Sequence, residues 1–522
     1  MQYILVLFFF ITSLGANDLY KQLSSKQESF TQTTLNTRFR ITFENIPLAN
    51  SKDMGVVGTH YDIFPLQNNP FYMSFGFYNA MTGEDGGFFT FGYTLGVDYE
   101  FYKNISLDGG VYVGGGSGKY IGFDNGGLML RSHLGLSYEL GNTEVTLGLS
   151  RTSFPNTQRN KEYENDIHPF FALHINDQVW KEYKKGNQGV VKNFNGLFRN
   201  IRITPVVVYY DIDEKQTKRS DLYSADDLYQ ENFPMLGIQL ERFFNKEMFV
   251  SMEAYGALAS AAGYAAIEAG LGYDLWLSRS FAWESKMVVG SAGDGRIDTA
   301  GGFIFQPMTG LRYKFASSYS LKTLVGRTYA PAGKFSATTY EVGLSFDAFA
   351  AKPKAGIYSF SKSRFSNLKW TMSPSYKYYI PYDSTHKGES ADSSEEIGLI
   401  GIMIGVDLND YVRLLGTTHW AATGNVGSYA EGLFGMKLST AAFSPLKLKA
   451  TVQGELGAGA GGSINTSSGG YVTQFVGGLE IPVFEHSSFG LYGGDMKTSD
   501  GRFKARTFMA SLNIGMNFLH KQ

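Results

Sequence analysis

The chain has no cysteine among its 522 residues, so a disulfide framework and thiolate metal sites are both excluded. Charged residues make up only 18%, and the formal net charge of −2 leaves no basic excess for binding nucleic acid. No run of about 20 apolar residues occurs, which excludes a protein that crosses a membrane with helices. Aromatic residues, by contrast, reach 15%, and there are 62 glycines. This composition indicates a secreted protein built mainly of β-strands.

A glycine pattern occurs three times along the chain, in residues 125–140, 300–315 and 468–483. In each segment a Gly-Gly pair is followed, eight residues after its second glycine, by another glycine and then a leucine. The later glycines are Gly135, Gly310 and Gly478, at spacings of 175 and 168 residues. Repetition at a nearly fixed period predicts three copies of one multi-strand module. We expect the copies to superpose, with the shared glycines facing the interior.

Apolar and polar residues alternate within the segments that we expect to be strands. In 88–101, for example, Phe91 and Tyr93 alternate with Gly92 and Thr94. Alternation with a period of two is typical of a strand with one apolar face. The segments run to about 10–14 residues, which is long for a globular protein but suits a tilted membrane crossing. The fold class is therefore all-β, a transmembrane antiparallel β-barrel.

Each of the three repeats contains about eight predicted strands, or about 24 in the chain. In the first repeat they are 38–46, 54–64, 71–81, 88–101, 105–115, 127–140, 143–152 and 166–179. In the second they are 201–211, 235–244, 248–259, 264–277, 281–291, 302–315, 319–330 and 339–349. In the third they are 370–381, 397–408, 411–421, 429–440, 447–458, 470–484, 488–496 and 506–518.

The connections between these strands fall into two classes. Those after even-numbered strands of a repeat are tight turns such as 102–104, whereas those after odd-numbered strands are long and polar, such as 211–234 and 382–396. Outer-membrane barrels have this asymmetry, with short periplasmic turns and long extracellular loops. We therefore expect the long loops outside the cell, so that tags at Lys218 and Lys387 would be labelled on intact cells.

The N-terminus has the pattern of a secretory signal peptide, because apolar residues Ile4 to Ile11 precede small residues that end at Ala16. It departs from the usual pattern in having no Lys or Arg before the apolar run. The predicted division of the chain is signal peptide 1–16, barrel repeat 1 at 17–190, barrel repeat 2 at 191–357 and barrel repeat 3 at 358–522.

On these patterns, the whole mature sequence resembles the Gram-negative outer-membrane β-barrel class. Residues 507–518 alternate toward the aromatic Phe518, like the C-terminal signal that the barrel-assembly machinery reads, although four residues follow here. The resemblance implies localisation in the cell outer membrane. It also implies contact with outer-membrane lipid and lipopolysaccharide, and with the barrel-assembly machinery during biogenesis.

Two forms of closure are compatible with three repeats of about eight strands. One ring of about 24 strands would enclose a wide lumen, open or plugged, whereas three tandem eight-stranded barrels would have packed interiors. The linkers 181–199 and 350–368 favour separate barrels, and the growth of barrels by hairpin duplication within one ring favours the single ring. We expect the single ring, with the three tandem barrels as the alternative.

Polar residues on the non-lipid face of the strands are candidates to line the lumen, because a charge facing lipid near the midplane would cost about 2–4 kcal/mol. These candidate lumen-facing residues are Arg131, Glu139, Glu253, Glu268, Asp274, Gln306, Arg312, Lys314, Lys437, Gln474 and Glu480. Their mixed sign argues against a strongly ion-selective pore.

The chain contains no motif that predicts catalysis or cofactor binding. The segment 114–120 lacks the first glycine and the Ser or Thr of a phosphate-binding loop, and the strand histidines His60, His133, His168 and His419 are isolated from one another. Acidic loop residues more plausibly form a solvated rim than a calcium site; they are Asp211, Asp213, Glu214, Asp226, Asp227, Glu395 and Glu396. We expect no catalytic residue, no cofactor, no metal and no enzymatic activity.

The expected function is a passive channel or export conduit for solutes or a polymer. Only about 20 residues separate Ala16 from the first strand, so we expect no plug domain of the kind that an energised transporter requires. The alternative is a non-conducting structural or adhesive outer-membrane protein that presents surface loops. An outer-membrane hydrolase is a third and less favoured hypothesis.

Overall fold

The computed structural model describes residues 34–521 with internal gaps. The residues outside the described set are 1–33, 48–52, 66–68, 84–85, 118–126, 156–166, 181–187, 192–200, 214–215, 218–227, 230–231, 246, 262, 294, 296, 317–318, 348–355, 360–364, 384–394, 428, 462–463, 465–469, 485–486, 499–501 and 522.

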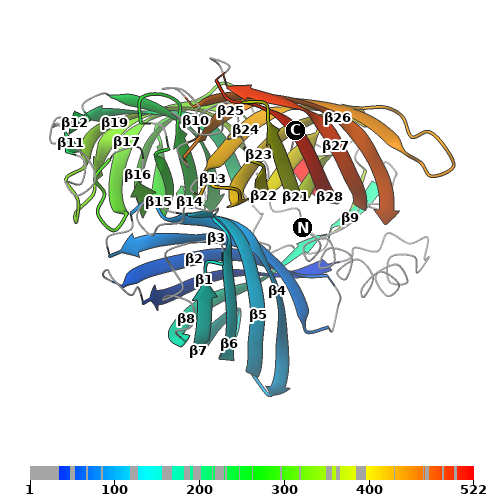
Figure 1. The fold of residues 1–522 in the computed structure, drawn as a ribbon, viewed down its shortest axis with the longest axis horizontal. Helices are drawn as coiled ribbons and strands as arrows, with labels where there is room; N and C mark the ends of the chain where they lie inside the picture. The colour runs from blue at the N-terminus through cyan, green and yellow to red at the C-terminus, as the bar shows by residue number, and fades with distance from the viewer. Residues whose placement is uncertain are drawn as a thin grey trace.

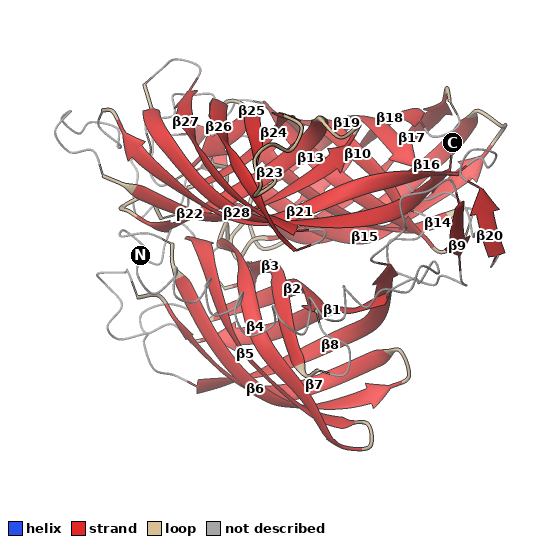
Figure 2. Ribbon diagram, turned by 90° about the vertical axis from the view of Figure 1, so that its right-hand side faces the viewer, coloured by secondary structure: helices blue, strands red, loops and turns tan. Residues whose placement is uncertain are grey.

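Long antiparallel strands form three closed barrels of eight strands each (Figures 1 and 2). Barrel 1 consists of β1 (Thr34–Ile46), β2 (Met54–Phe64), β3 (Phe71–Thr82), β4 (Phe89–Tyr102), β5 (Ile105–Ser117), β6 (Met129–Leu140), β7 (Thr143–Ser153) and β8 (Ile167–Trp180). Barrel 2 consists of β10 (Ile201–Ile212), β13 (Phe233–Phe243), β14 (Met248–Ala257), β15 (Ala265–Trp276), β16 (Phe281–Gly293), β17 (Phe303–Lys314), β18 (Tyr319–Tyr329) and β19 (Ser336–Asp347). Barrel 3 consists of β21 (Phe365–Pro381), β22 (Ile397–Asp407), β23 (Val412–Thr423), β24 (Ala430–Ser439), β25 (Lys449–Ala460), β26 (Tyr471–Phe484), β27 (Ser487–Thr498) and β28 (Lys504–Lys521).

The last strand of each barrel pairs with the first strand of the same barrel. Phe43 of β1 lies opposite Phe171 of β8, and Val207 of β10 lies opposite Val342 of β19. A single ring would instead require β8 to pair with β10, and β19 with β21. The expected ring of about 24 strands is therefore wrong, and the three tandem barrels of the alternative are formed. Closure after eight strands leaves no strand edge unpaired in any of the three repeats.

Two pairs of short strands lie outside the barrels, one pair in the linkers and one in a long loop. In the two linkers, β9 (Gln188–Val191) pairs with β20 (Gly356–Ser359), so the segments that join consecutive barrels contact each other. In the long loop after β10, β11 (Gln216–Thr217) pairs with β12 (Leu228–Tyr229). None of these four strands was predicted from the sequence.

The repeated glycines occupy the sixth strand of each barrel, in β6, β17 and β26. They alternate with exposed leucines and lie on the same strand face as buried polar residues, so they face the barrel interior as expected. A Cβ on Gly310 would lie 2.1 Å from the carbonyl oxygen of Thr323, and one on Gly478 would lie 2.1 Å from that of Leu491. The neighbouring strand therefore leaves no space for a side chain at these positions.

The three barrels pack against one another in the same orientation. At the long-loop end, Gly86 of barrel 1 donates a backbone hydrogen bond to Ala300 of barrel 2, 2.8 Å long. At the short-turn end, an apolar cluster joins Tyr61 of barrel 1 to Ile203 of barrel 2 and Trp370 of barrel 3. Because loop ends meet loop ends and turn ends meet turn ends, the barrels could cross one bilayer together.

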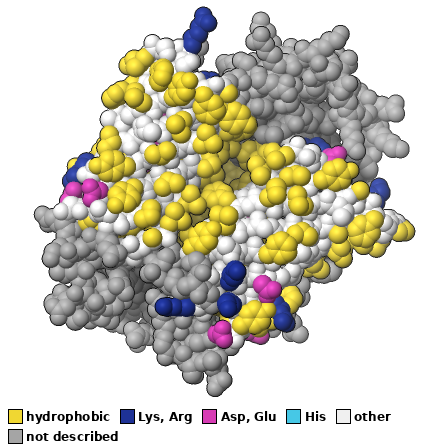
Figure 3. Space-filling model, turned by 90° about the horizontal axis from the view of Figure 1, so that it is seen from above, with side chains coloured by type: hydrophobic (Ala, Val, Ile, Leu, Met, Phe, Trp, Pro, Cys, Tyr) yellow, Lys and Arg dark blue, Asp and Glu magenta, His cyan; other side chains and the backbone are white. Residues whose placement is uncertain are grey.

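The outer surface of the barrels is apolar. Exposed large side chains alternate with buried polar ones along the strands; on β6, Leu134 and Leu136 are 57% and 56% exposed, whereas Arg131 is 2% exposed. Figure 3 shows such apolar side chains over two adjacent lobes, with basic and acidic side chains gathered at the margins. Among the described residues no helix is long and apolar enough to cross a bilayer.

Candidate functional site

The candidate site is the polar interior of each barrel, which is built by the inward-facing residues of the alternating strands. In all three barrels, apolar side chains close the end nearest the long loops, and charged side chains fill the rest of the interior. Some of these charges, such as Glu44, Arg131 and Glu431, lie in the half nearer the long loops.

In barrel 1, ion pairs cross the interior between strands, most of which are not neighbours in the sheet. Arg38 of β1 contacts Asp62 at 2.8 Å and Glu144 of β7 at 3.3 Å. Arg131 of β6 contacts Glu44 of β1, with Nε 3.0 Å from the carboxylate. All of these side chains are nearly or fully buried. The pairs of Arg38 with Glu144 and of Arg131 with Glu44 therefore connect strands that are not hydrogen-bonded to each other.

Four of the eight histidines in the chain are buried inside barrel 1. His60 lies against the rings of Tyr78 and Tyr112, with ring centroids 4.7 and 5.6 Å away. His174 is hydrogen-bonded to Thr146 at 2.8 Å. The other two, His133 and His168, each lie near a carboxylate, at 3.5 Å from Asp108 and 3.6 Å from Glu44 respectively. Of the four histidines predicted as isolated, His60, His133 and His168 thus share one interior, whereas His419 is buried in barrel 3. Among the described residues they form no metal-binding group.

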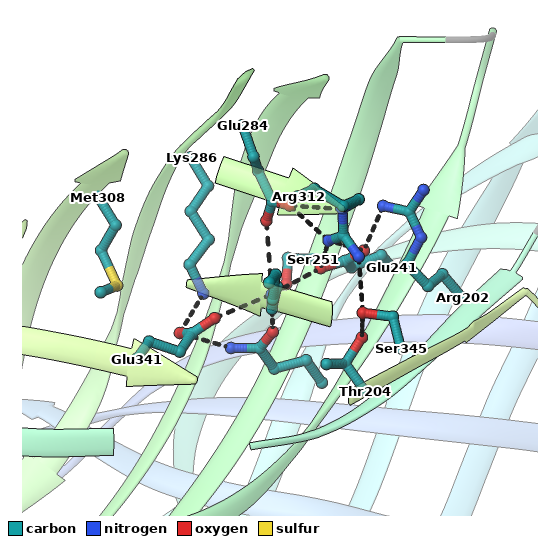
Figure 4. A network of polar contacts seen from close by, with 12 residues as sticks. Arg202, Thr204, Glu241, Ser251, Glu284, Lys286, Met308, Arg312, Glu341 and Ser345 are labelled. Carbon is teal, nitrogen blue, oxygen red and sulfur yellow. Dashed lines mark hydrogen bonds and ion pairs between the residues drawn. The ribbon is translucent and has the colours of Figure 1, made fainter. Parts of the chain in front are cut away.

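Barrel 2 has the most extensive charge network (Figure 4). Lys286 of β16 donates to Glu253 at 2.7 Å and to Glu341 of β19 at 2.9 Å. Lys322 contacts the same Glu341 at 2.9 Å and also Glu241 at 3.0 Å. Glu341 is shared by the two amines, whereas Glu253 is ion-paired with Lys286 and with no other cation among the described residues, so loss of Lys286 leaves Glu253 without a cationic partner.

Two arginines extend this network toward the turn end of barrel 2. Arg202 of β10 contacts Glu241 at 3.1 Å and Asp274 at 3.0 Å. Arg312 of β17 donates from Nε to Glu284 at 2.7 Å and from Nη1 to the hydroxyl of Ser345 at 2.6 Å. The network therefore reaches strands on every side of the interior.

Barrel 3 contains smaller polar clusters. Lys377 donates to Glu431 at 2.6 Å, and the hydroxyl of Tyr379 donates to the same carboxylate at 2.8 Å. Nearer the turn end, Lys437 is ion-paired with Glu480. The amides of Gln453 and Gln474 donate to Glu455 at 2.8 and 2.7 Å, which forms a third cluster.

Aromatic and aliphatic side chains fill the loop end of each barrel. In barrel 2, the rings of Tyr210, Phe233 and Tyr264 lie 5.3–6.1 Å apart, and Phe335 joins them. The corresponding side chains in barrel 1 include Tyr78, Phe88, Tyr112 and Met129, and those in barrel 3 include Tyr379, Ile397, Tyr429 and Phe503. A layer of packed apolar and aromatic side chains of this kind opposes the passage of ions.

Most of the sequence-predicted lumen candidates lie inside the barrels, but not around a common lumen. The buried ones are Arg131 in barrel 1; Glu253, Glu268, Asp274, Gln306 and Arg312 in barrel 2; and Lys437, Gln474 and Glu480 in barrel 3. Lys314 is half-buried and pairs with Asp347 at 3.3 Å. Glu139 is exposed beside the β6–β7 turn, because its strand has already left the barrel interior at that point.

Several interior charges were missed by the sequence analysis, notably Arg38 and Arg40 of β1. Their signal is legible, because they alternate with Phe39 and Ile41 in the same way as the predicted candidates do. Of the acidic loop residues, Asp213 pairs with Arg327 and Asp211 accepts from Asn232 at 2.8 Å. Glu395 and Glu396 accept hydrogen bonds from Asn425 and Tyr378, whereas Glu214, Asp226 and Asp227 lie outside the described residues.

Comparisons with known proteins find no matching family model and no matching curated protein. Solved structures that resemble the chain include a copper transporter, OprC, at 10% identity and a TM-score of 0.29, covering 94% of this chain and 81% of that one. The siderophore receptor PirA of Pseudomonas aeruginosa has 9% identity and a TM-score of 0.27, covering 94% and 82%. OpdL of Pseudomonas aeruginosa has 10% identity and a TM-score of 0.19, covering 93% and 98%.

These likenesses are too weak to assign a function. The architecture instead follows from the strand pairing, which closes three antiparallel sheets, and from the alternation of an apolar exterior with a polar interior. In these features the chain resembles the Gram-negative outer-membrane β-barrel class.

Proposed function

We propose that this protein is an integral outer-membrane protein whose three packed barrels hold long loops at the cell surface, as a structural or adhesive element without an open channel. The apolar exterior supports the membrane location, because side chains such as Leu134, Val342 and Phe475 would otherwise expose large apolar patches to water.

The observation that carries this proposal is the filled interior of every barrel. In barrel 2, the charge network around Lys286 extends across the interior from β16 to β14 and β19. The aromatic layer around Tyr210 lies between that network and the loop end. Eight-stranded barrels have an interior just wide enough for side chains. A channel or export conduit, the function first expected, would require these side chains to separate.

Most of the buried carboxylates of the described residues have structural partners. Their acidic and histidine side chains form no group that could hold a metal, and the buried carboxylates are engaged mainly with lysines and arginines. The proposal therefore assigns the interior charges to stability and the working surface to the loops.

Planar-bilayer recording of the purified protein tests the proposal. A sample shown to be folded by its heat-dependent shift in gel mobility should give no large, stable conductance steps. Frequent steps of constant size from the same sample would contradict the packed interior and support a channel. Separation of inner and outer membranes, with the protein found in the outer fraction and resistant to carbonate washing, tests the location separately.

A further inference from the structure

The junctions between the three barrels use the same pair of strands each time. The third strand of barrel 1, β3, lies against the fifth strand of barrel 2, β16. The third strand of barrel 2, β14, lies against the fifth strand of barrel 3, β25. The third strand of barrel 3, β23, returns to the fifth strand of barrel 1, β5. Contacts of this head-to-tail kind close when the last unit meets the first, so the barrels follow one another in a cyclic arrangement (Figures 1 and 2).

The contact surface of the third strand is its loop end, where each repeat has an alanine. Ala80, Ala257 and Ala421 each donate the backbone N–H to the aromatic residue just before the fourth strand, at 2.9–3.0 Å. The three alanines are therefore equivalent positions. Two of their carbonyl oxygens meet the next barrel: that of Ala80 accepts a hydrogen bond from the hydroxyl of Ser291, and that of Ala421 would lie 2.7 Å from a Cβ on Gly115.

The surface that receives this alanine is an outward position on the fifth strand. Gly115 and Ser291 each lie seven residues after the inward residue that pairs with the repeated glycine of the sixth strand, so they are equivalent. Both are buried, whereas Val111 and Met287, four residues earlier on the same faces, are 51% and 52% exposed. In barrel 3 the equivalent residue is Ala458, on the strand that contacts β14. The position is thus small in every repeat, and the neighbouring barrel covers it in barrels 1 and 2.

The Gly-Gly pair that precedes each sixth strand takes part in the same junctions. A Cβ on Gly127 would lie 2.8 Å from the carbonyl oxygen of Ala421, and a Cβ on Gly302 would lie 2.8 Å from that of Ala80. Gly127 is also crowded within its own barrel, by the carbonyl oxygen of Gly116. The second glycine of the pair therefore has the same neighbour from another barrel in two repeats, which gives this repeated motif a role in joining barrels.

We propose that each repeat carries two complementary docking surfaces, and that the partner of each surface is another repeat of the same chain. One surface is the alanine end of the third strand, and the other is the Gly-Gly segment with the fifth strand beside it. The three barrels then form a single-chain trimer that these junctions hold together without the linkers. Gly86 donates a backbone hydrogen bond to Ala300 at 2.8 Å, so long loops of barrels 1 and 2 form one continuous surface.

Barrel 1 is the repeat whose attachment can be tested by itself. The segment 181–187, which lies outside the described residues, separates β8 from β9. The pairing of β9 with β20 connects the two later barrels and does not involve barrel 1. A protease site inserted after Lys185 therefore breaks the covalent connection of barrel 1 and leaves barrels 2 and 3 in one fragment.

Cleavage of the folded, detergent-purified full chain at this site tests the proposal. A tag at the C-terminus captures barrels 2 and 3, and the barrel 1 fragment recovered with them over a dilution series measures its association. Barrel 1 should remain bound when no other residue is changed. G115W and S291W should each weaken the association by about tenfold, and the double variant should release barrel 1, because the facing backbone leaves no space for the ring. The matched control V111W/M287W places the same side chains at exposed equivalent positions and should retain barrel 1.

Separation of barrel 1 on cleavage of the otherwise unchanged chain would overturn the proposal. Full retention in the double variant, or equal release in the double variant and the control, would also overturn it. Heat-dependent gel mobility shows whether each fragment is folded.

If the double variant does not fold, the cysteine pair G86C/A300C in the uncut chain gives an independent answer. A disulfide between these positions supports the junction of barrels 1 and 2, and its absence contradicts the junction. The inference goes beyond the proposed function, since barrels without a channel need not associate. Conductance is recorded separately, so failure of either proposal can be told from failure of the other.

Discussion

At the scale of single residues, the interior of barrel 2 depends on Lys286. Its amine neutralises Glu253 and Glu341 at the same time, and all three side chains are fully buried. Substitution of Lys286 by Met should leave two buried carboxylates without this partner and lower the free energy of unfolding by about 3–5 kcal/mol. Urea unfolding of the protein in lipid vesicles, followed by tryptophan fluorescence, measures the loss.

A matched control comes from Lys314, which pairs with Asp347 in the same barrel but is 28% exposed. Lys314→Met should cost about 1 kcal/mol or less, because solvent screens a partly exposed pair. Equal destabilisation by the two substitutions would contradict this expectation, because burial would then have no effect on the free energy that an ion pair contributes.

The interior glycines give a second test at the residue scale. A Cβ on Gly310 would lie 2.1 Å from the backbone oxygen of Thr323, so Gly310→Ala should force β17 and β18 apart and cost about 1–3 kcal/mol. Gly432, also within a strand, has open space around its Cβ position. Gly432→Ala should therefore leave unchanged the temperature at which the heat-dependent shift in gel mobility occurs. A similar loss of stability in both variants would refute the steric argument.

Interior residues were partly predictable from the sequence, because alternation is a local property of a strand. Nine of the eleven lumen candidates lie buried in a barrel, among them Arg312 and Glu253. Glu139 lies on the correct strand face but beyond the barrel interior, which the pattern of alternation could not show. The pairing of charges across a barrel also depends on contacts between distant strands, such as Arg38 with Glu144, that no local pattern contains.

At the scale of elements, the strands were largely predictable. The predicted strand 54–64 coincides with β2, and the predicted 201–211 differs from β10 by one residue. Long alternating runs bounded by Gly, Asn and Ser turns determine such boundaries locally. The pairing of β9 with β20 had no comparable signal, since four-residue strands in polar linkers show too little alternation.

The alternation of short and long connections predicts the topology. β6 and β7 are joined between Leu140 and Thr143, whereas β21 and β22 are joined between Pro381 and Ile397. Tags inserted at Lys218 and Lys387, which lie outside the described residues, should react with a non-permeant reagent on intact cells. Reaction only after rupture of the outer membrane would show that the long connections face the periplasm.

At the scale of the whole molecule, closure was the feature that the sequence could not determine. A period of two specifies which face of a strand is apolar, but not which strand completes the ring. The same eight-strand repeats are compatible with both closures until the partner of each first strand is known. In the structure that partner is the last strand of the same repeat, as with β10 and β19.

Inter-strand disulfide formation tests the central claim of three closed barrels most directly. The chain has no cysteine, so engineered pairs have no background. The first pair, F43C/F171C, joins β1 to β8, and the second, V207C/V342C, joins β10 to β19; these residues lie directly opposite each other with their side chains outward. Opposed positions on paired strands fall within the Cα separation that a disulfide requires.

Both of these pairs should oxidise to high yield in the folded protein, as measured by gel mobility and by mass spectrometry of linked peptides. Cysteine pairs that only a single ring would bring together should remain reduced. These pairs combine Val342→Cys in turn with cysteine at Tyr376, Tyr378 or Ile380. Efficient cross-linking of β19 to β21, with none between β10 and β19, would contradict three separate barrels and restore the single ring.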